Sequence, residues 1–176
     1  MDAKRGSEPA PMKNRTTVER KSERELVATR TINGPARIVF EAWTKAELFK
    51  RWWVPKSIGV SLLACEMDVR VGGKSRLVFG NDASSSMEFF GRYIEVTPHS
   101  RLVWTNDEGD EGRVVTTVTF EEKGCQTLLV VHDLYPSKEA LDLAVASGSS
   151  MDAMPETLEQ LDEFVVTLGA QGIGLG

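Results

Sequence analysis

Residues 101–134 read RLVWTNDEGDEGRVVTTVTFEEKGCQTLLVVHDL and contain three runs rich in Val, Leu and Thr, residue types that favour β-strands. The runs cover residues 101–105, 113–120 and 127–134, and short segments rich in Asp, Glu, Gly and Lys separate them. Connections this short cannot contain a crossover helix, so they join antiparallel neighbours. The stretch therefore predicts an antiparallel meander.

The preceding part of the chain extends this meander. Further β-prone runs cover residues 60–65, 75–79 and 87–96, again with turn residues between them. An earlier run, residues 26–32, ends at the strong breaker Asn33-Gly34-Pro35. We therefore expect one separate strand near the N-terminus and a long series of hairpins later in the chain.

Two short helices are expected between the first strand and the meander. The apolar residues Val39, Phe40 and Trp43 follow helical spacing after the breaker. Thr44, followed three residues later by Glu47, has the pattern of a capping box and predicts the start of a second helix. The segment Trp52-Trp53-Val54-Pro55 should end this region, because proline disfavours helix in the residue before it.

The C-terminal part predicts a helical region and then a long amphipathic helix. Ser137 is a plausible N-cap for the first of them, and we expect a break between Gly148 and Pro155. After the break, apolar residues recur every three or four positions and form one stripe: Met151, Met154, Leu158, Leu161, Val165 and Leu168.

Together these elements predict an α+β fold, in which a curved antiparallel sheet wraps around the long C-terminal helix. An apolar sheet face needs a cover, and only the last helix is long enough to provide it. We expect a cavity between this helix and the sheet, unless large side chains fill the space.

Length and charge limit the classes of protein that fit. The 176 residues suit one domain, which we place at residues 22–168 between a disordered tail at 1–21 and a flexible end at 169–176. The N-terminal tail carries six basic and three acidic residues, whereas the whole chain carries −5. A net negative charge argues against a nucleic-acid binder.

The chain has no apolar run long enough for a membrane span and no apolar leader at its start. We therefore expect a cytoplasmic protein in which Cys65 and Cys125 remain reduced. These two cysteines lack the spacing of a metal site, and the acidic stretch 107–112 lacks the ligand offsets of a calcium loop. We expect no metal and no cofactor.

Several motifs, in this order, resemble the START-like (SRPBCC) superfamily, and within it the branch of activator of heat-shock protein 90 ATPase homologues. The resemblance covers roughly residues 24–168 and rests on Gly34–Trp43, Trp52–Pro55, Gly91–Pro98, Arg101–Thr105, Val118–Phe120, Leu134–Ala140 and Ala146–Gly148. It implies a helix-grip fold with a hydrophobic ligand cavity. It does not imply one activity, because the superfamily contains carriers, receptors, enzymes and co-chaperone domains.

The candidate binding residues are mostly aromatic residues and methionines. Phe89 and Tyr93 flank Gly91 at period two and so face one side of their strand, with Trp104 in the next strand. Met residues adapt to irregular ligands, and we expect Met151 and Met154 to form a movable lid. The full predicted ligand-binding set is Trp53, Met87, Phe89, Tyr93, Trp104, His132, Met151, Met154 and Leu158. The alternative is that these side chains are ordinary core.

Three functions fit these residues. The first is non-catalytic binding of a small apolar or amphipathic ligand by a monomer or homodimer. The second is a co-chaperone-like stress-response role on a heat-shock protein chaperone. The third is a cyclase or hydrolase with His132 or Tyr93 as acid or base. It ranks last, because His132 and its neighbour Asp133 point to opposite faces of their strand and no nucleophile–base set is visible.

Overall fold

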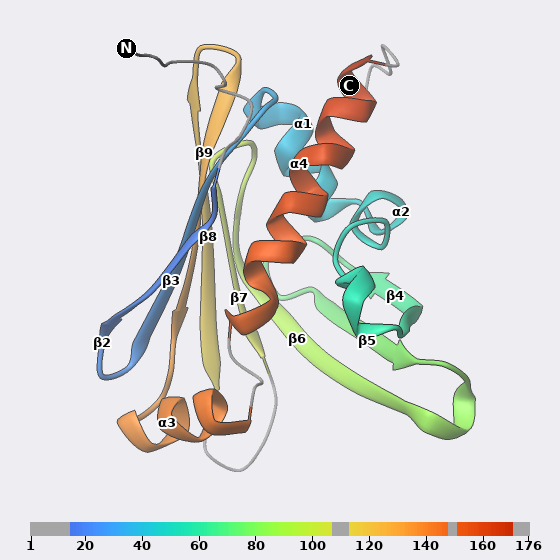
Figure 1. Ribbon diagram of the computed structural model, residues 1–176, viewed down its shortest axis with the longest axis vertical. Coiled ribbons are helices and arrows are strands. Elements are labelled where there is room, and N and C mark those ends of the chain that lie inside the picture. The colour runs from blue at the N-terminus through green and yellow to red at the C-terminus, as the bar shows by residue number, and fades with distance from the viewer. Residues whose placement is uncertain (1–14, 107–112, 148–150, 171–176) are drawn as a thin grey trace, which may run out of the picture.

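The computed structural model describes residues 15–106, 113–147 and 151–170. Its central element is one eight-stranded antiparallel sheet in the order β2-β3-β9-β8-β7-β6-β5-β4 (Figure 1). The strands are β2 (Thr17–Ser22), β3 (Glu25–Ile32), β4 (Ser61–Met67), β5 (Lys74–Gly80), β6 (Ser86–Thr97), β7 (Arg101–Asn106), β8 (Val114–Lys123) and β9 (Gln126–Leu134). From β4 to β9, sequence neighbours pair, as the meander predicts. The two remaining pairings are β2 with β3 and β3 with β9.

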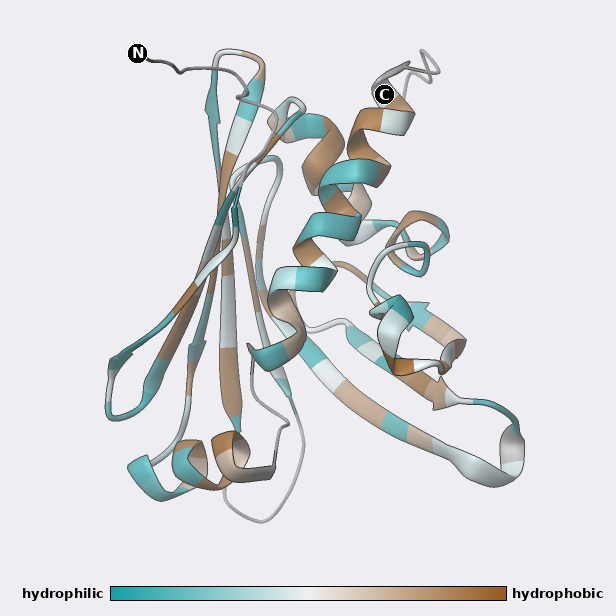
Figure 2. Ribbon diagram, in the orientation of Figure 1, coloured by the Kyte–Doolittle hydropathy of each residue, from teal (hydrophilic) through white to brown (hydrophobic). Residues whose placement is uncertain are grey.

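Helices lie mainly against one face of this sheet (Figure 1). They are α1 (Ala36–Thr44), α2 (Ala46–Phe49), α3 (Lys138–Ser147) and α4 (Met154–Ala170), with short 3₁₀ turns η2 (Lys56–Ile58), η3 (Ala83–Ser85) and η4 (Met151–Ala153). Hydrophilic and hydrophobic residues alternate along several strands, and the helices carry residues of both kinds (Figure 2). This α+β arrangement confirms the predicted fold class.

Two predictions about element ends need correction. The first is the capping box. The N-cap of α2 is Lys45, which makes no side-chain cap, and the Thr44 hydroxyl instead donates to the Phe40 carbonyl oxygen, 2.9 Å away in α1. In contrast, Ser137 Oγ accepts a hydrogen bond from the Ala140 amide at 3.0 Å, as an N-cap does.

The second correction concerns the ends of the domain. Residues 17–22, placed mostly in the predicted tail, form the edge strand β2 and pair with β3. All six of its residues are exposed, so it lacks the apolar alternation by which a strand is recognised. At the other end, Gly169 and Ala170 belong to α4. Residues 1–14, 107–112 and 171–176 lie outside the described part of the chain.

The main core lies between α4 and the sheet. Leu158, Leu161 and Val165 of α4 are almost fully buried and form one cluster with Ala28 of β3 and Leu129 of β9. Side chains therefore fill the space in which the sequence predicts a cavity. Leu158, one of the predicted ligand-binding residues, is a core residue with no exposed surface.

Polar side chains of α4 also hold the neighbouring chain in place. Gln160 Nε2 donates to the carbonyl oxygens of Trp52 (2.9 Å) and Val54 (3.0 Å), and its Oε1 accepts the Lys56 amide at 2.9 Å. One turn earlier, Glu156 accepts hydrogen bonds from the amide and hydroxyl of Ser57. These contacts fix the segment that follows α2 against α4.

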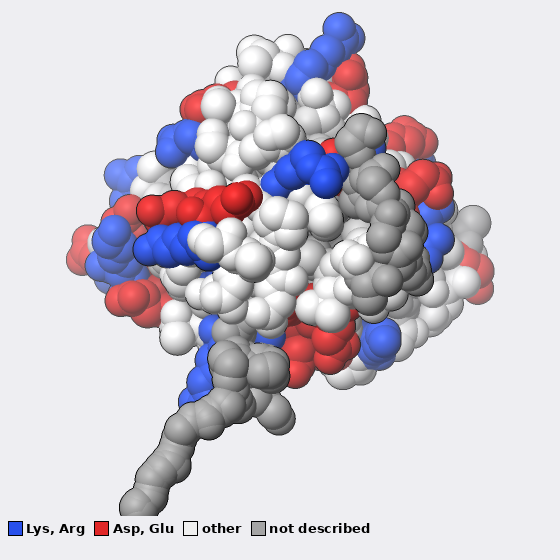
Figure 3. Space-filling model, turned by 90° about the horizontal axis from the view of Figure 1, so that it is seen from above, with Lys and Arg blue, Asp and Glu red and all other residues white. Residues whose placement is uncertain are grey.

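The surface carries charges of both signs. Seen from the end of the molecule where α4 finishes, Lys and Arg side chains alternate with Asp and Glu side chains (Figure 3). This face therefore lacks the single-sign field that attracts a nucleic-acid backbone.

Candidate functional site

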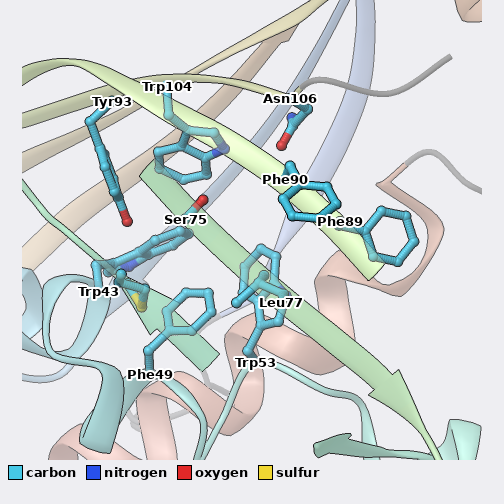
Figure 4. A pocket seen from close by; sticks show the side chains of 11 residues that line it. Trp43, Phe49, Trp53, Ser75, Leu77, Phe89, Phe90, Tyr93, Trp104 and Asn106 are labelled. Atoms are coloured by element: carbon cyan, nitrogen blue, oxygen red, sulfur yellow. The ribbon is translucent and has the colours of Figure 1, made fainter. Parts of the chain in front are cut away.

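A pocket lies on the concave face of the sheet, where β5, β6 and β7 meet α1, α2 and the segment after α2 (Figure 4). Its cavity volume is about 60 Å³. The lining residues are Trp43, Phe49, Trp53, Met67, Ser75, Leu77, Phe89, Phe90, Tyr93, Trp104 and Asn106. Seven of these eleven side chains are aromatic. None of the lining residues comes from α4, so the pocket lies beside this helix and not beneath it.

The helical wall of the pocket is a cluster of four aromatic rings. Phe49 and Trp53 stack with their ring centroids 4.7 Å apart, and Trp43 meets Trp52 edge-to-face at 4.9 Å. Trp52 is fully buried, and its indole nitrogen donates to the Ala42 carbonyl oxygen at 3.0 Å. Trp52 thereby anchors the segment to α1, which places the next residue, Trp53, at the pocket.

The sheet wall consists of side chains that are paired across strands. Tyr93 on β6 pairs with Trp104 on β7, and the two rings meet edge-to-face at 6.2 Å. Leu77 on β5 pairs with Phe89 on β6 in the same way. Burial raises the pKa of the Tyr93 phenol, so this group stays protonated at neutral pH.

Two polar side chains converge at one end of this apolar surface. Ser75 and Asn106 occupy the two positions that pair with Gly91, one on each neighbouring strand. A Cβ atom at position 91 would lie 2.9 Å from Ser75 Oγ and 2.8 Å from the Thr105 carbonyl oxygen. The glycine is thus required by close packing, and its missing side chain leaves room for the two polar groups.

A hydrogen-bonded chain leads from Asn106 into the sheet. The Asn106 amide nitrogen lies 3.4 Å from Thr116 Oγ1 on β8, and the Thr116 hydroxyl donates to Asp133 Oδ1 on β9 at 2.6 Å. Burial raises the pKa of the Asp133 carboxyl to about 6, despite the Thr116 hydrogen bond, which lowers it. At slightly basic pH this carboxylate is therefore ionised, and it accepts the hydrogen bond that the Thr116 hydroxyl donates.

A second polar feature of the pocket is the indole N–H of Trp43. Trp43 is 1% exposed, and its nitrogen has no hydrogen-bond partner within the described chain. A buried donor without an acceptor costs about 1–3 kcal/mol. In Figure 4 the Tyr93 hydroxyl points toward this indole.

Four of the nine predicted ligand-binding residues line this pocket, namely Trp53, Phe89, Tyr93 and Trp104. Met87 pairs with Phe79 farther along the β5–β6 arm, where it is 62% exposed. Met154 packs against the core at the start of α4. The side chain of Met151 lies outside the described part of the structure, so the lid of two methionines stays a prediction.

His132 lies on the other face of the sheet. Val131 and Leu129 on the same strand face the core. His132 points to the opposite side, where its Nε2 atom is 2.7 Å from Glu25 Oε2. This contact lowers the pKa of the Glu25 carboxyl. The structure therefore places His132 in a partly exposed pair with Glu25, away from the pocket.

Seven lining residues were not predicted from the sequence, and these are Trp43, Phe49, Met67, Ser75, Leu77, Phe90 and Asn106. Trp43 was predicted only as an apolar position of the first short helix. The period of two along β5 could have identified Ser75 and Leu77 as one face of that strand. Asn106 carried no such indication, because it is a polar residue at a strand end.

Other kinds of site find little support in the described residues. Within residues 15–106, 113–147 and 151–170 there is no group of three or more His, Cys, Asp or Glu side chains that could hold a metal ion. Cys65 and Cys125 are free thiols, and burial raises the pKa of Cys65 to about 11. None of the helices described is both long and apolar enough to cross a membrane.

The curved antiparallel sheet, the pair of short helices and the long C-terminal helix define a helix-grip protein of the START-like class. The profile of the family described as "Activator of Hsp90 ATPase homolog 1-like protein" matches residues 33–165, and the chain belongs to this family. A comparison with curated proteins found no significant match.

Similar solved structures support the same fold. A protein from Rhodobacter sphaeroides is 24% identical with a TM-score of 0.76, covering 87% of this chain and 99% of that one. A protein from Nitrosomonas europaea is also 24% identical, with a TM-score of 0.74 over 86% of this chain and 99% of that one. The "AHSA1-like protein" from Aeromonas hydrophila is 19% identical, with a TM-score of 0.60 over 85% and 96% of the two chains.

Proposed function

We propose that this protein binds a small aromatic or otherwise apolar molecule, without covalent chemistry, in the pocket between β5–β7 and the α1–α2 region. The observation that carries the proposal is the aromatic lining, in which Trp53 and Trp104 come from opposite walls. Concave apolar pockets with a few convergent polar groups are the usual form of small-molecule sites. Membership of a START-like family, many members of which hold hydrophobic ligands, supports it.

The size of the pocket limits how the ligand is held. A cavity of about 60 Å³ is smaller than the roughly 150 Å³ of a cavity that takes up benzene. A ring therefore enters only if lining side chains move or if part of the ligand remains at the rim. Met67 is suited to such movement because it is unbranched, and Phe90, 47% exposed, provides a rim surface.

The direct test is a titration of the isotope-labelled protein with toluene, followed by NMR. Amide shifts should concentrate on β5–β7 and on the segment around Trp53. Leu77→Phe should reduce the affinity at least tenfold by filling the pocket, whereas Leu128→Phe, the same change on a strand outside the pocket lining, should not. Equal effects of the two substitutions, or no shifts at all, would contradict the proposal.

A second candidate function follows from the family description, which names an activator of a heat-shock protein ATPase. On this hypothesis the chain would act on the chaperone as a monomer or homodimer in the cytoplasm, where its two free thiols would remain reduced. The test is the ATPase rate of the purified chaperone with increasing amounts of this protein. An unchanged rate would exclude the hypothesis.

An enzymatic role finds less support. Among the described residues that line the pocket, Tyr93 has no His, Asp or Glu side chain to act as its partner, and burial keeps the phenol protonated. General acid–base catalysis needs a group that titrates near the working pH within reach of the substrate.

A further inference from the structure

The polar end of the pocket has a defined direction of hydrogen bonding. Asp133 is an acceptor when it is ionised, so the single proton of the Thr116 hydroxyl is used in the 2.6 Å contact with Asp133 Oδ1. Thr116 Oγ1 is then left with lone pairs only. It can pair with Asn106 only through the amide NH₂ group, which lies 3.4 Å away.

This sets the orientation of the Asn106 side chain. With its nitrogen turned toward Thr116, the carbonyl oxygen Oδ1 is the atom left for the pocket, and Figure 4 shows the oxygen on that side. Across the vacant position at Gly91 lies the Ser75 hydroxyl, which can donate or accept. The pocket therefore presents an acceptor with a hydroxyl opposite it.

We propose that the ligand of this pocket is an aromatic molecule with a hydrogen-bond donor on its ring, such as a phenol, whose donor binds Asn106 Oδ1. This inference rests on the proposed function and adds the polar group that the ligand must carry. The aromatic ring of the ligand packs among Trp53, Trp104 and Phe89. The phenolic oxygen accepts a hydrogen bond from the Ser75 hydroxyl, and the phenolic O–H donates one to Asn106 Oδ1.

The test compares three probes of similar size, which are phenol, anisole and toluene. Dissociation constants are measured by NMR titration at about pH 8, where Asp133 is ionised. A net hydrogen bond is worth about 0.5–1.5 kcal/mol, so phenol should bind about three- to tenfold more tightly than anisole, which has no proton to donate.

Variants of β8 connect this preference to the hydrogen-bonded chain. Thr116→Val removes the hydroxyl and leaves the Asn106 amide free to turn, so the preference for phenol should fall to about twofold or less. Thr116→Ser keeps a hydroxyl and should retain the preference. Thr117→Val, the same change on the opposite face of β8, is the matched control and should behave as the wild type.

Asn106→Leu provides a second route if Thr116→Val fails to fold. It should abolish the preference for phenol while toluene still binds. A phenol-to-anisole ratio near one in the wild-type protein, or a full preference retained in Thr116→Val or Asn106→Leu, would overturn the inference but leave the proposed function intact. Failure of all three probes to bind would overturn both.

Discussion

Arg30 of β3 and Asp162 of α4 form a buried ion pair that fixes the long helix to the sheet. The Arg30 Nη2 atom lies 3.0 Å and the Nε atom 3.1 Å from Asp162 Oδ2. Asp162 Oδ1 accepts the Asn33 amide at 2.9 Å, so one carboxylate joins α4 both to β3 and to the turn that precedes α1.

Removing the arginine should therefore be costly. Arg30→Met leaves a buried carboxylate without its main counter-charge, and we expect the free energy of unfolding to fall by about 3 kcal/mol or more. Urea unfolding measures this directly. Arg20→Met is the matched control, because Arg20 pairs with Asp142 at the surface and should lose at most about 1 kcal/mol. Similar losses in the free energy of unfolding of both variants would show that the ion pair at α4 stabilises the fold no more than a surface ion pair does.

The three hydrogen bonds of Gln160 should control the segment that carries Trp53. Gln160→Leu keeps the bulk of the side chain but removes these bonds, leaving the Lys56 amide without its partner. We expect about 1–3 kcal/mol of destabilisation and faster hydrogen exchange at Lys56. Glu159→Leu, on the exposed side of the same helix, should leave that exchange rate unchanged. An unaltered rate in Gln160→Leu would contradict the interpretation.

Asp133 should make stability depend on pH in a direction opposite to that of most carboxylates. Its pKa is raised from 3.8 to about 6 in the fold, so the folded state binds more protons than the unfolded state between these values. Its contribution is fully present below about pH 4 and is lost as the pH rises through about 6, by roughly 1–3 kcal/mol.

The measurement for Asp133 is urea unfolding of the wild type and of Asp133→Asn from about pH 4 to pH 8. Surface carboxylates such as Asp142, whose pKa is lowered, affect both proteins alike and cancel in the difference. The stability of the wild type relative to the variant should therefore increase as the pH falls. A difference that stays flat across this range would show that Asp133 has an ordinary pKa.

Gly91 should not tolerate even one additional carbon atom. In Gly91→Ala the new Cβ would lie within 3 Å of the Thr105 carbonyl oxygen and of Ser75 Oγ, so β7 and Ser75 must shift. We expect a loss of about 1–3 kcal/mol in thermal or urea unfolding. Gly124→Ala is an instructive comparison: its Cβ would meet no atom within 4 Å, and any cost there comes from its φ of 66° alone.

The strands that could be predicted from the sequence are those in which more and less buried residues alternate regularly. The β8 and β9 strands alternate buried and half-buried residues, and their period of two is plain in the sequence. β2 has no buried residue and so has no period, although its backbone pairs with β3, with one register shift between Arg20 and Ser22. The register shift between Tyr93 and Glu95 likewise breaks the period of two in β6 at the pocket.

The candidate site was harder to predict, because its location depends on which space the core leaves open. The stripe of Leu158, Leu161 and Val165 correctly indicated the buried face of α4. Periodicity does not show how closely such a stripe packs, and here it packs fully. The remaining space lies over β5–β7, where strand pairing brings Tyr93 and Trp104 together. Both residues were predicted to lie on neighbouring strands, but no local spacing shows that Trp43 and Phe49 lie opposite them.

The grip of Gln160 and Glu156 on residues 52–57 has a mechanical consequence. A bulky molecule that pushes Trp53 outward must pull on the same backbone that α4 holds, so entry into the pocket and fraying at the start of this helix share one energetic cost. Substitutions that stabilise the start of α4 should therefore slow both the binding and the release of a ligand.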